Sequence, residues 1–264
     1  MLELNNVTKI FNAGTVNEKV ALDDLSLTLN DGDFVTVIGG NGAGKSTMLN
    51  AIAGVWKPDA GRILIDGTDV TGMPEHKRAA FLGRVFQDPM MGTAADMEIV
   101  ENLALAARRG RSRGLKWGIT RKEREQYREQ LAQLGLGLED RMSAKVGLLS
   151  GGQRQAVTLL MATLQRPKLL LLDEHTAALD PATAAIVMSL TEKIITGEQL
   201  TAVMVTHNMQ NAITYGNRLV MMDHGKIILD IAGEEKSKLT IEDLLEKFRE
   251  ISGTQFASDR ALIG

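Results

Sequence analysis

The chain has 264 residues, enough for one large domain or two small ones, and 30 basic against 33 acidic side chains give a formal net charge of −3. That balance lacks the broad positive field that gathers nucleic acid, so no nucleic-acid partner is expected. The absence of cysteine excludes disulfides and cysteine-ligated metals, fits a reducing compartment and makes the cytoplasm the default location.

Strands are predicted at the start of the chain. Residues 2–11 and 21–29 alternate apolar and polar side chains, which indicates an antiparallel β region. The nearly all-apolar runs at 34–38, 169–173 and 202–206 are typical of strands buried on both faces. Together they predict an α/β fold with a mainly parallel sheet and an antiparallel β annex.

Helices are predicted between these strands and at the end of the chain. From about residue 97 to 165 apolar side chains recur at intervals of three and four residues, which predicts an α-helical insertion. A short amphipathic helix behind a Thr240 cap closes the fold, with its apolar face formed by Ile241, Leu244, Leu245, Phe248 and Ile251. We expect one domain over residues 1–230, a helical subdomain at about 88–165 within it, and a short tail over 231–264. The predicted apolar runs and the N-terminal residues indicate neither a membrane span nor an export signal.

A glycine-rich stretch, IGGNGAGKST at residues 38–47, lies between a predicted strand and a predicted helix. It fits the pattern G-x-x-x-x-G-K-[ST], whose backbone N–H groups and helix start surround phosphate oxygens. Lys45 is expected to reach the terminal phosphates of a nucleoside triphosphate, and Ser46 to ligate magnesium. A chance glycine turn is the alternative interpretation. The predicted phosphate loop comprises Gly39, Gly40, Asn41, Gly42, Ala43, Gly44, Lys45, Ser46 and Thr47.

Two carboxylates end the predicted strand LLLLDE at residues 169–174. Successive strand side chains point in opposite directions, so the two acids serve different tasks. Asp173 is suited to the magnesium shell, through a bound water, and Glu174 to orienting or deprotonating the water that attacks the γ-phosphate. Solvated turn residues are the alternative, and the phosphate loop in the same chain favours catalysis.

A second glycine element, LLSGGQRQ at residues 148–155, opens a predicted helix with Ser150 and Gln153 at capping-box spacing. Capping alone does not require Gly151 and Gly152, which lower helix stability, so a close approach of the backbone to another group is indicated. A phosphate suits such a helix start.

These motifs together resemble the nucleotide-binding subunit of ATP-binding cassette (ABC) transporters over nearly the whole chain. GGNGAGKST resembles the family's Walker A loop, VFQDP its Q-loop, LSGGQ its signature and LLLLDE its Walker B strand. ALD at 178–180 resembles the D-loop, and VTH the strand that carries the switch histidine. The resemblance implies the ABC ATPase fold and hydrolysis of magnesium-bound ATP.

The resemblance also implies roles for individual residues. Phe11 takes the place of the family's adenine-stacking aromatic, where tyrosine is more usual. Gln87 would lie near magnesium and the attacking water, and His207 would point toward the γ-phosphate. Without the family, Gln87 would be an ordinary loop residue, while Phe11 would be a core residue and His207 a structural one.

A head-to-tail homodimer with two sandwiched ATP molecules follows from the family pattern, because the signature of one copy contacts ATP on the Walker A loop of the other. Asp180 would help join the two sites. The signature residues acting in trans are Ser150, Gly151, Gly152 and Gln153.

One position departs from the family. Members commonly read DEPT after Walker B, whereas this chain reads DEHTAALDP with His175 in the proline position. We interpret His175 as a tolerated loop variant of a subfamily. The change leaves both acids in place and raises a question about pH response.

The resemblance implies separate membrane permease subunits as partners and a peripheral position on the cytoplasmic face of the membrane. The segment after Gln87 is where the family receives the permease, and Met90, Met91 and Met97 offer an adaptable apolar surface for it, or fill gaps in the core. The basic stretch at 108–118 is a solvated loop or a contact for anionic lipid headgroups. An extracytoplasmic substrate-binding protein is expected in the same system.

Other functions share parts of this pattern. DNA-repair or chromosome ATPases usually separate the Walker motifs with a long coiled coil, whereas 127 residues lie between Lys45 and Asp173 here. Translation-associated relatives usually carry two cassettes, whereas this chain has a single set of motifs. The hypothesis of a P-loop kinase does not explain the LSGGQ motif. A mechanical regulator of an envelope complex stays open as an alternative. The sequence DEHTAALDP and the tail LTIEDLLEKF resemble cassettes of importers for tryptophan- or tyrosine-type solutes, and the short tail disfavours importers with an added regulatory domain.

Overall fold

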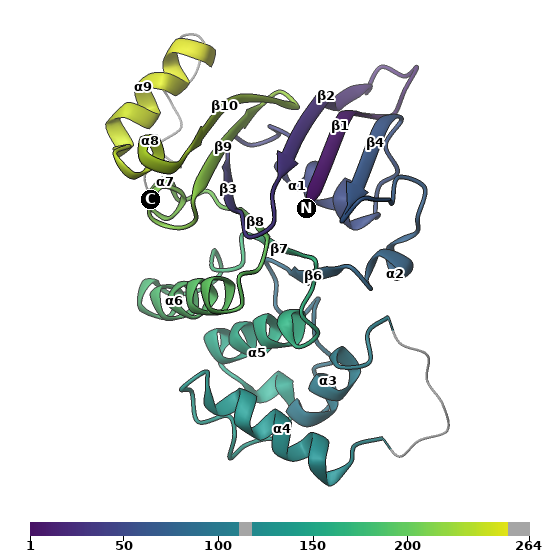
Figure 1. Cartoon of the computed structure of the whole chain (residues 1–264), viewed down its shortest axis with the longest axis vertical. Coiled ribbons are helices and arrows are strands. Elements are labelled where there is room, and N and C mark those ends of the chain that lie inside the picture. Colours follow the sequence, from purple (N-terminus) through teal and green to yellow (C-terminus); the bar gives the residue numbers. More distant parts are fainter. Residues whose placement is uncertain (111–117, 253–264) are drawn as a thin grey trace. The chain divides into compact units, whose positions relative to one another are not determined.

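The computed structural model describes residues 1–110 and 118–252, with the backbone alone for residues 251 and 252. The chain divides into two compact units (Figure 1). The first unit combines residues 1–78 with those from 201 onward, and the second comprises residues 79–200. Each unit contains both strands and helices, in agreement with the expected α/β class.

An antiparallel sheet opens the first unit. Its strands run in the order β2 (Lys19–Leu29), β1 (Leu2–Phe11), β4 (Ala60–Ile65) and β5 (Thr68–Asp69), and Figure 1 shows the first three in purple and blue. Leu2, Leu4 and Val7 of β1 are fully buried, whereas the intervening side chains are more exposed. The alternating pattern therefore predicted the annex correctly, but it did not indicate β4 and β5.

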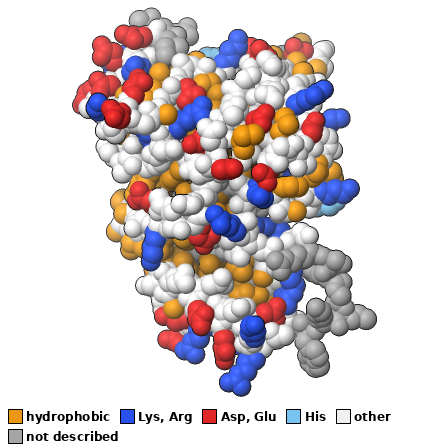
Figure 2. All heavy atoms as spheres, viewed as in Figure 1, with side chains coloured by type: hydrophobic (Ala, Val, Ile, Leu, Met, Phe, Trp, Pro, Cys, Tyr) orange, Lys and Arg blue, Asp and Glu red, His pale blue; other side chains and the backbone are white. Residues whose placement is uncertain are grey.

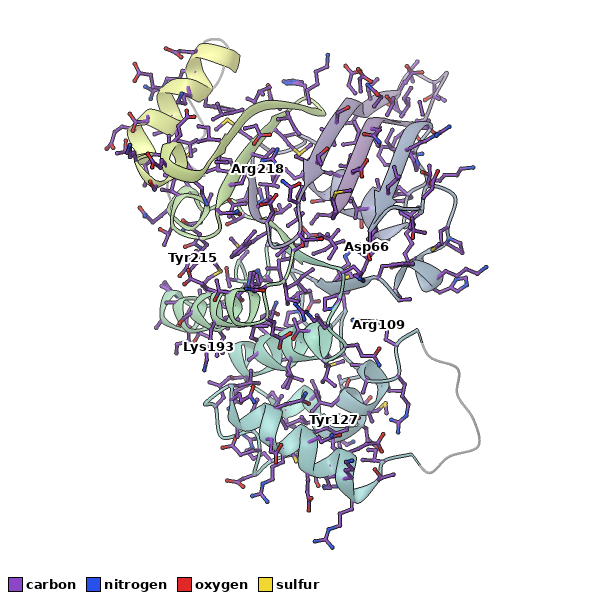
Figure 3. The ribbon with its side chains drawn as sticks, in the orientation of Figure 1. Asp66, Arg109, Tyr127, Lys193, Tyr215 and Arg218 are labelled. Carbon is purple, nitrogen blue, oxygen red and sulfur yellow. The ribbon has the colours of Figure 1, made fainter. Side chains whose placement is uncertain are left out.

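Parallel strands carry the glycine-rich loop. In the first unit, β3 (Phe34–Ile38) lies between β8 (Ala202–Val205) and β9 (Arg218–Asp223) and runs parallel to both, and all five of its side chains are buried. The antiparallel strand β10 (Lys226–Ala232) pairs with β9. Arg218 on β9 forms an ion pair with Asp230 on β10, with a nitrogen–oxygen distance of 2.5 Å (Figure 3).

Two helices follow β3 in this unit, α1 (Lys45–Ala53) and the short α2 (Glu75–Arg78). The Arg78 side chain is 1% exposed and caps the C-terminus of α1. Its Nη1 atom donates hydrogen bonds to the carbonyl oxygens of Ala51 and Ile52, at 2.6 and 2.9 Å. The buried guanidinium thus supplies a donor to the Ile52 carbonyl and a second donor to the Ala51 carbonyl, which also accepts from the Gly54 N–H group at 3.3 Å.

Three further helices belong to the first unit: α7 (Met209–Thr214) before β9, and α8 (Gly233–Ser237) and α9 (Ile241–Ser252) in the tail. Thr240 caps α9 as predicted, since its hydroxyl accepts a hydrogen bond from the Asp243 N–H group. Leu244 and Phe248 are buried in a cluster that includes Met209, and charged side chains cover the outer face of α9 at the upper left of Figure 2. The side chain of Ile251 lies outside the described residues.

The second unit combines two parallel strands with a helical core. Strand β6 (Leu82–Val85) pairs in parallel with β7 (Leu169–Asp173). The expected helical region contains α3 (Ile99–Ala106), α4 (Arg121–Ala132), the 3-10 turn Val146–Leu148 and α5 (Gly151–Thr163), and α6 (Pro181–Gly197) follows β7. Leu103, Tyr127 and Val157 bring α3, α4 and α5 into one buried cluster, and Figure 3 labels Tyr127 there.

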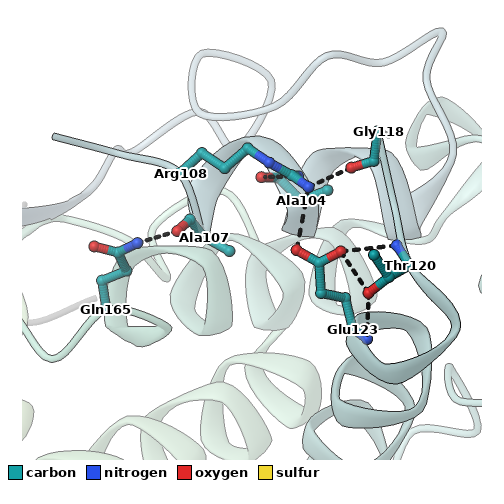
Figure 4. Close-up of polar contacts among 7 residues, drawn as sticks. All are labelled: Ala104, Ala107, Arg108, Gly118, Thr120, Glu123 and Gln165. Carbon is teal, nitrogen blue, oxygen red and sulfur yellow. Dashed lines mark hydrogen bonds and ion pairs between the residues drawn. The ribbon is translucent and has the colours of Figure 1, made fainter. Parts of the chain in front are cut away.

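The beginning of the basic stretch at 108–118 is tied into the second unit. Arg108 donates to the Ala104 carbonyl at 2.8 Å and pairs with Glu123 at 3.1 Å (Figure 4). Arg109 donates to the Ala162 carbonyl at 3.1 Å, and burial lowers its pKa. These two arginines therefore serve internal contacts rather than a solvated loop. Residues 111–117, which include the other basic residues of the predicted lipid contact, lie outside the described residues.

Candidate nucleotide site

The phosphate loop connects β3 to α1, as the motif predicted. Gly39 adopts φ +153°, and a Cβ atom there would lie 2.2 Å from the carbonyl oxygen of Met222. Only glycine fits this position, because any side chain would displace the backbone of β9. The β9 strand thus fixes the start of the loop.

Lys45 spans this loop from the first residue of α1. Its side chain is 5% exposed, and Nζ donates to the carbonyl oxygens of Gly39 at 2.7 Å and Gly40 at 3.0 Å. Gly44, which precedes the helix, has no side chain to accept hydrogen bonds from the first turn. A helix start with a buried cation beside it is well suited to bind phosphate. Exposed Ser46 follows on α1, and of the other loop residues Asn41 and Gly42 are exposed, Thr47 is partly buried and Ala43 is buried.

His207 lies beside the beginning of the phosphate loop. Gly39, Gly40, Thr206 and His207 line one small pocket of the first unit, together with four apolar residues, Ile38, Met209, Met221 and Phe248. The structure therefore brings the predicted switch histidine and the predicted phosphate loop together. The place of Phe248 at this pocket was missed, because the sequence shows only that this side chain lies on the apolar face of α9.

Phe11, the predicted adenine-stacking residue, ends β1 and packs against Trp56. The two ring centroids are 5.3 Å apart, and the ring planes are nearly perpendicular, at 84°. Trp56 is 41% exposed, and Lys9 Nζ lies 5.5 Å from the centre of the Phe11 ring. Sequence analysis did not identify Trp56, since nothing in its neighbourhood marks it as the partner of a residue 45 positions earlier.

The second unit holds the two predicted acids at the end of β7. Asp173 is paired with Arg84 of β6, with 3.7 Å between Nη2 and Oδ2, and the Arg84 guanidinium also lies 4.5 Å from the centre of the Phe86 ring. Gln87 follows Phe86 directly, and the Phe86 carbonyl accepts a hydrogen bond from Gln155 at 3.3 Å. Glu174 has φ +45°, a left-handed backbone conformation that is costly for a residue other than glycine.

The signature residues begin α5. Ser150 and Gln153 form the capping box that the spacing predicted, with hydrogen bonds of 3.3 and 3.2 Å between side chain and backbone. A Cβ atom on Gly152 would lie 2.1 Å from the Thr183 methyl group of α6. The close approach inferred from this glycine is therefore one to α6, and a phosphate contact of the motif stays a prediction. Asp180 caps α6, where hydrogen bonds from Thr183 lower the pKa of its carboxyl group.

His175 lies in the turn that follows β7 and Glu174, which agrees with the expected loop position. Its side chain is 1% exposed, and Nε2 lies 3.0 Å from the hydroxyl oxygen of Thr191 on α6. Burial lowers the pKa of the imidazole to about 4, so the ring is neutral near pH 7. A buried residue with a specific partner thus follows Glu174, and sequence analysis did not indicate this burial.

Comparison with known proteins decides the family. A family model described as "ABC transporter" matches residues 22–177, which is more than half of the chain. The chain belongs to the ABC transporter family. Its ATPase fold and its role as an ATP-hydrolysing subunit coupled to transport, both predicted from the motifs, are thereby confirmed.

Individual relatives agree with this family. The chain is 44% identical to the "Tyrosine transport ATP-binding protein" of Clostridioides difficile over 94% of its own length and 98% of the relative's. It is 36% identical to the methionine import ATP-binding protein MetN of Corynebacterium diphtheriae, of which it spans 64%. Among solved structures, a dimeric ATP-binding cassette in a post-hydrolysis state with ADP and phosphate gives a TM-score of 0.75 at 31% identity, covering 88% of this chain and 98% of that one.

No membrane-crossing segment is found in the part of the ABC chain that the structure describes, since none of its helices is both long and apolar enough.

Proposed function

We propose that this ABC ATPase drives the import of a small solute of the amino-acid class, with tyrosine the first candidate. The observation that carries the proposal is the 44% identity to a tyrosine transport ATP-binding protein across nearly the full length of both chains. The match to a methionine import subunit supports the same solute class. The family and these relatives favour transport over the alternative of a mechanical regulator of an envelope complex, which shares the ATP chemistry.

We propose that the phosphate loop binds the triphosphate of ATP and that Phe11 stacks on the adenine. The N–H groups of Gly39 to Thr47 would face phosphate oxygens, and the ammonium of Lys45 would move from the Gly39 and Gly40 carbonyls to the terminal phosphates. Because Lys45 is buried at the start of α1, its charge acts at close range there.

Magnesium is expected with ATP, and the oxygen donors of Ser46, Gln87 and Asp173 match the preference of this hard cation. No group of three or more His, Asp or Glu side chains that could hold a metal occurs among the described residues. That finding fits magnesium, which usually takes one or two protein carboxylates and completes its shell with substrate phosphates and water. Bound there, the ion would offset negative charge on the phosphates.

Hydrolysis is assigned to Glu174, which would orient and deprotonate the attacking water. His207 and Gln87 would hold the γ-phosphate and the water in line. His207 lines the same pocket as Gly39 and Gly40, which supports its proposed contact with the γ-phosphate.

We propose a head-to-tail homodimer in which Ser150, Gly151, Gly152 and Gln153 of one copy complete the ATP site of the other. Asp180 would join the two sites. The dimeric cassette structure with ADP and phosphate supports a dimer of such chains. Residues 1–230 would act as a single ATPase domain, with the helical subdomain at about 88–165, and the tail over 231–264 would follow it.

The partners of this subunit would be integral membrane permease subunits and an extracytoplasmic substrate-binding protein. We propose that the chain lies on the cytoplasmic face of the membrane and receives the permease after Gln87. Met91 is 71% exposed and Met90 41% exposed, so both side chains offer apolar surface to a partner, whereas Met97 is half-buried.

Purification of tagged Glu174→Gln protein from mildly solubilised native membranes with ATP tests this proposal. We expect a multispanning protein to co-purify in stoichiometric amount and deletion of the chain to abolish uptake of labelled tyrosine. Recovery of only soluble proteins or nucleic acid would overturn the transport role. Normal tyrosine uptake with a recovered permease would overturn the solute alone.

A further inference from the structure

His175 is tied to α6 through a hydrogen bond whose direction the neighbouring groups determine. The Thr191 hydroxyl donates its only proton to the carbonyl oxygen of Val187, at 2.8 Å. It can therefore only accept from His175, so the Nε2 atom of the imidazole carries the proton. Nδ1 is then an acceptor, and it is buried without a hydrogen-bond partner among the described residues.

This hydrogen bond joins two buried side chains. Thr191 is fully buried and His175 is 1% exposed, so water does not compete for the bond. A buried polar group that lost its partner would carry the full cost of desolvation. The bond therefore fixes His175 strongly against the third turn of α6.

Glu174, the residue before His175, needs such a support. Its left-handed backbone, at φ +45°, persists only where the surroundings hold it. The carbonyl oxygen of Glu174 accepts a hydrogen bond from the Ala177 N–H group at 2.9 Å, which closes a turn. The imidazole anchor and this turn together restrict the backbone that carries the Glu174 carboxylate.

We propose that His175 is a positioning residue for ATP hydrolysis, which holds the Glu174 backbone in its left-handed conformation through the hydrogen bond from Nε2 to Thr191. This inference rests on the proposed role of Glu174 as the base. A small displacement of a base that must act in line with a phosphorus atom lowers the rate of the chemical step. ATP affinity depends on other residues and is unaffected.

Two substitutions of His175 separate the hydrogen bond from general packing. The amide nitrogen of glutamine reaches the place of Nε2, whereas that of asparagine reaches only the place of Nδ1. We expect His175→Asn to lower kcat about 10-fold, which is the rate equivalent of one hydrogen bond, with an ATP Kd within about two-fold of wild type. His175→Gln retains a kcat within about two-fold of wild type.

Thr191→Val removes the acceptor and tests the same bond from α6. We expect a loss of kcat like that of His175→Asn, and no further loss in the double variant, because the two residues act as one unit. Thr196→Val is the matched control, since the Thr196 hydroxyl also bonds to the carbonyl four residues earlier, at 2.7 Å, but lies exposed without a histidine. Its kcat stays at the wild-type value.

Steady-state ATPase rates, ATP binding and melting temperatures are measured for these variants and for Glu174→Gln. Wild-type kcat in both His175→Asn and Thr191→Val, or a glutamine variant as slow as the asparagine one, would overturn the proposal. If His175→Asn does not fold, Thr191→Val is compared with Thr196→Val, and equal kcat values in these two variants would overturn it. Wild-type hydrolysis by Glu174→Gln would instead reject the assignment of the base.

Discussion

Among single residues, Lys45 is the one that we propose to matter most directly for ATP binding. Lys45→Ala removes both the charge for the terminal phosphates and the hydrogen bonds that hold the carbonyls of Gly39 and Gly40. Hydrogen bonds to charged groups contribute about 1.5–3 kcal/mol, so we expect the ATP Kd to rise about 10- to 100-fold. Titration with a fluorescent ATP analogue measures it. Lys193→Ala, on the exposed side of α6 (Figure 3), is the control, and an unchanged Kd in Lys45→Ala would contradict the assignment.

His175 gives the stability of the chain a dependence on pH. Its pKa is about 4 in the folded protein against 6.5 as the ordinary value, so the unfolded chain takes up the proton first as the pH falls. The free energy of unfolding should therefore decrease from pH 6.5 to pH 4, by about 3 kcal/mol from this residue. Urea unfolding in EDTA without nucleotide measures it for wild type and His175→Gln. Equal slopes in the two proteins would contradict the prediction, and His76→Gln, whose histidine is exposed, serves as control.

At the scale of elements, α1 depends on Arg78 for its C-terminus. Arg78→Ala removes the guanidinium donor from the Ile52 carbonyl and one of the two donors of the Ala51 carbonyl, and it opens a cavity, so we expect the free energy of unfolding to fall by about 3 kcal/mol. Arg78→Lys should lose less, because an ammonium can still donate. Denaturant unfolding compares the two variants, and an alanine variant as stable as wild type would contradict this role. Arg62→Ala, at an exposed position of β4, is the control.

Periodicity predicted the elements with strong patterns and missed the others. The all-apolar runs of β3, β7 and β8 and the helical spacing of α4 and α5 have few alternative structures, so their types were correct. Strand β4 begins with three exposed residues, and every residue of β10 except Ile231 is exposed or partly exposed. Such strands depend on pairing with a distant segment, which a local pattern does not contain.

In the candidate site, too, the sequence predicted the local features and missed those that depend on distant segments. The phosphate-loop pattern, the capping box of Ser150 and Gln153 and the Thr240 cap follow local rules, so the sequence indicates their residues directly. Trp56, Arg84 and the Thr191 partner of His175 contribute through contacts between segments far apart in the chain. For that reason the sequence indicated His175 only as an exchange of proline for histidine, and its burial emerged with the fold.

Two copies of the chain are proposed to work together as a dimer, since the Walker A loop and the signature of one chain would contact different ATP molecules. Apolar surface near the signature is consistent with a partner, because Leu148 is 72% exposed and Ile186 on α6 is 51% exposed. Binding of ATP would then stabilise the dimer, and hydrolysis would release it. A variant that binds ATP without hydrolysing it should accumulate as the dimer.

Glu174→Gln with magnesium and ATP provides the most direct test of this mechanism, by size-exclusion chromatography with light scattering and a phosphate-release assay on the same sample. We predict a dimer that retains two ATP molecules and a hydrolysis rate reduced by at least about 100-fold. The same variant without ATP should be monomeric. A Glu174→Gln protein that stays monomeric with ATP, or that releases phosphate at the wild-type rate, would contradict the central claim.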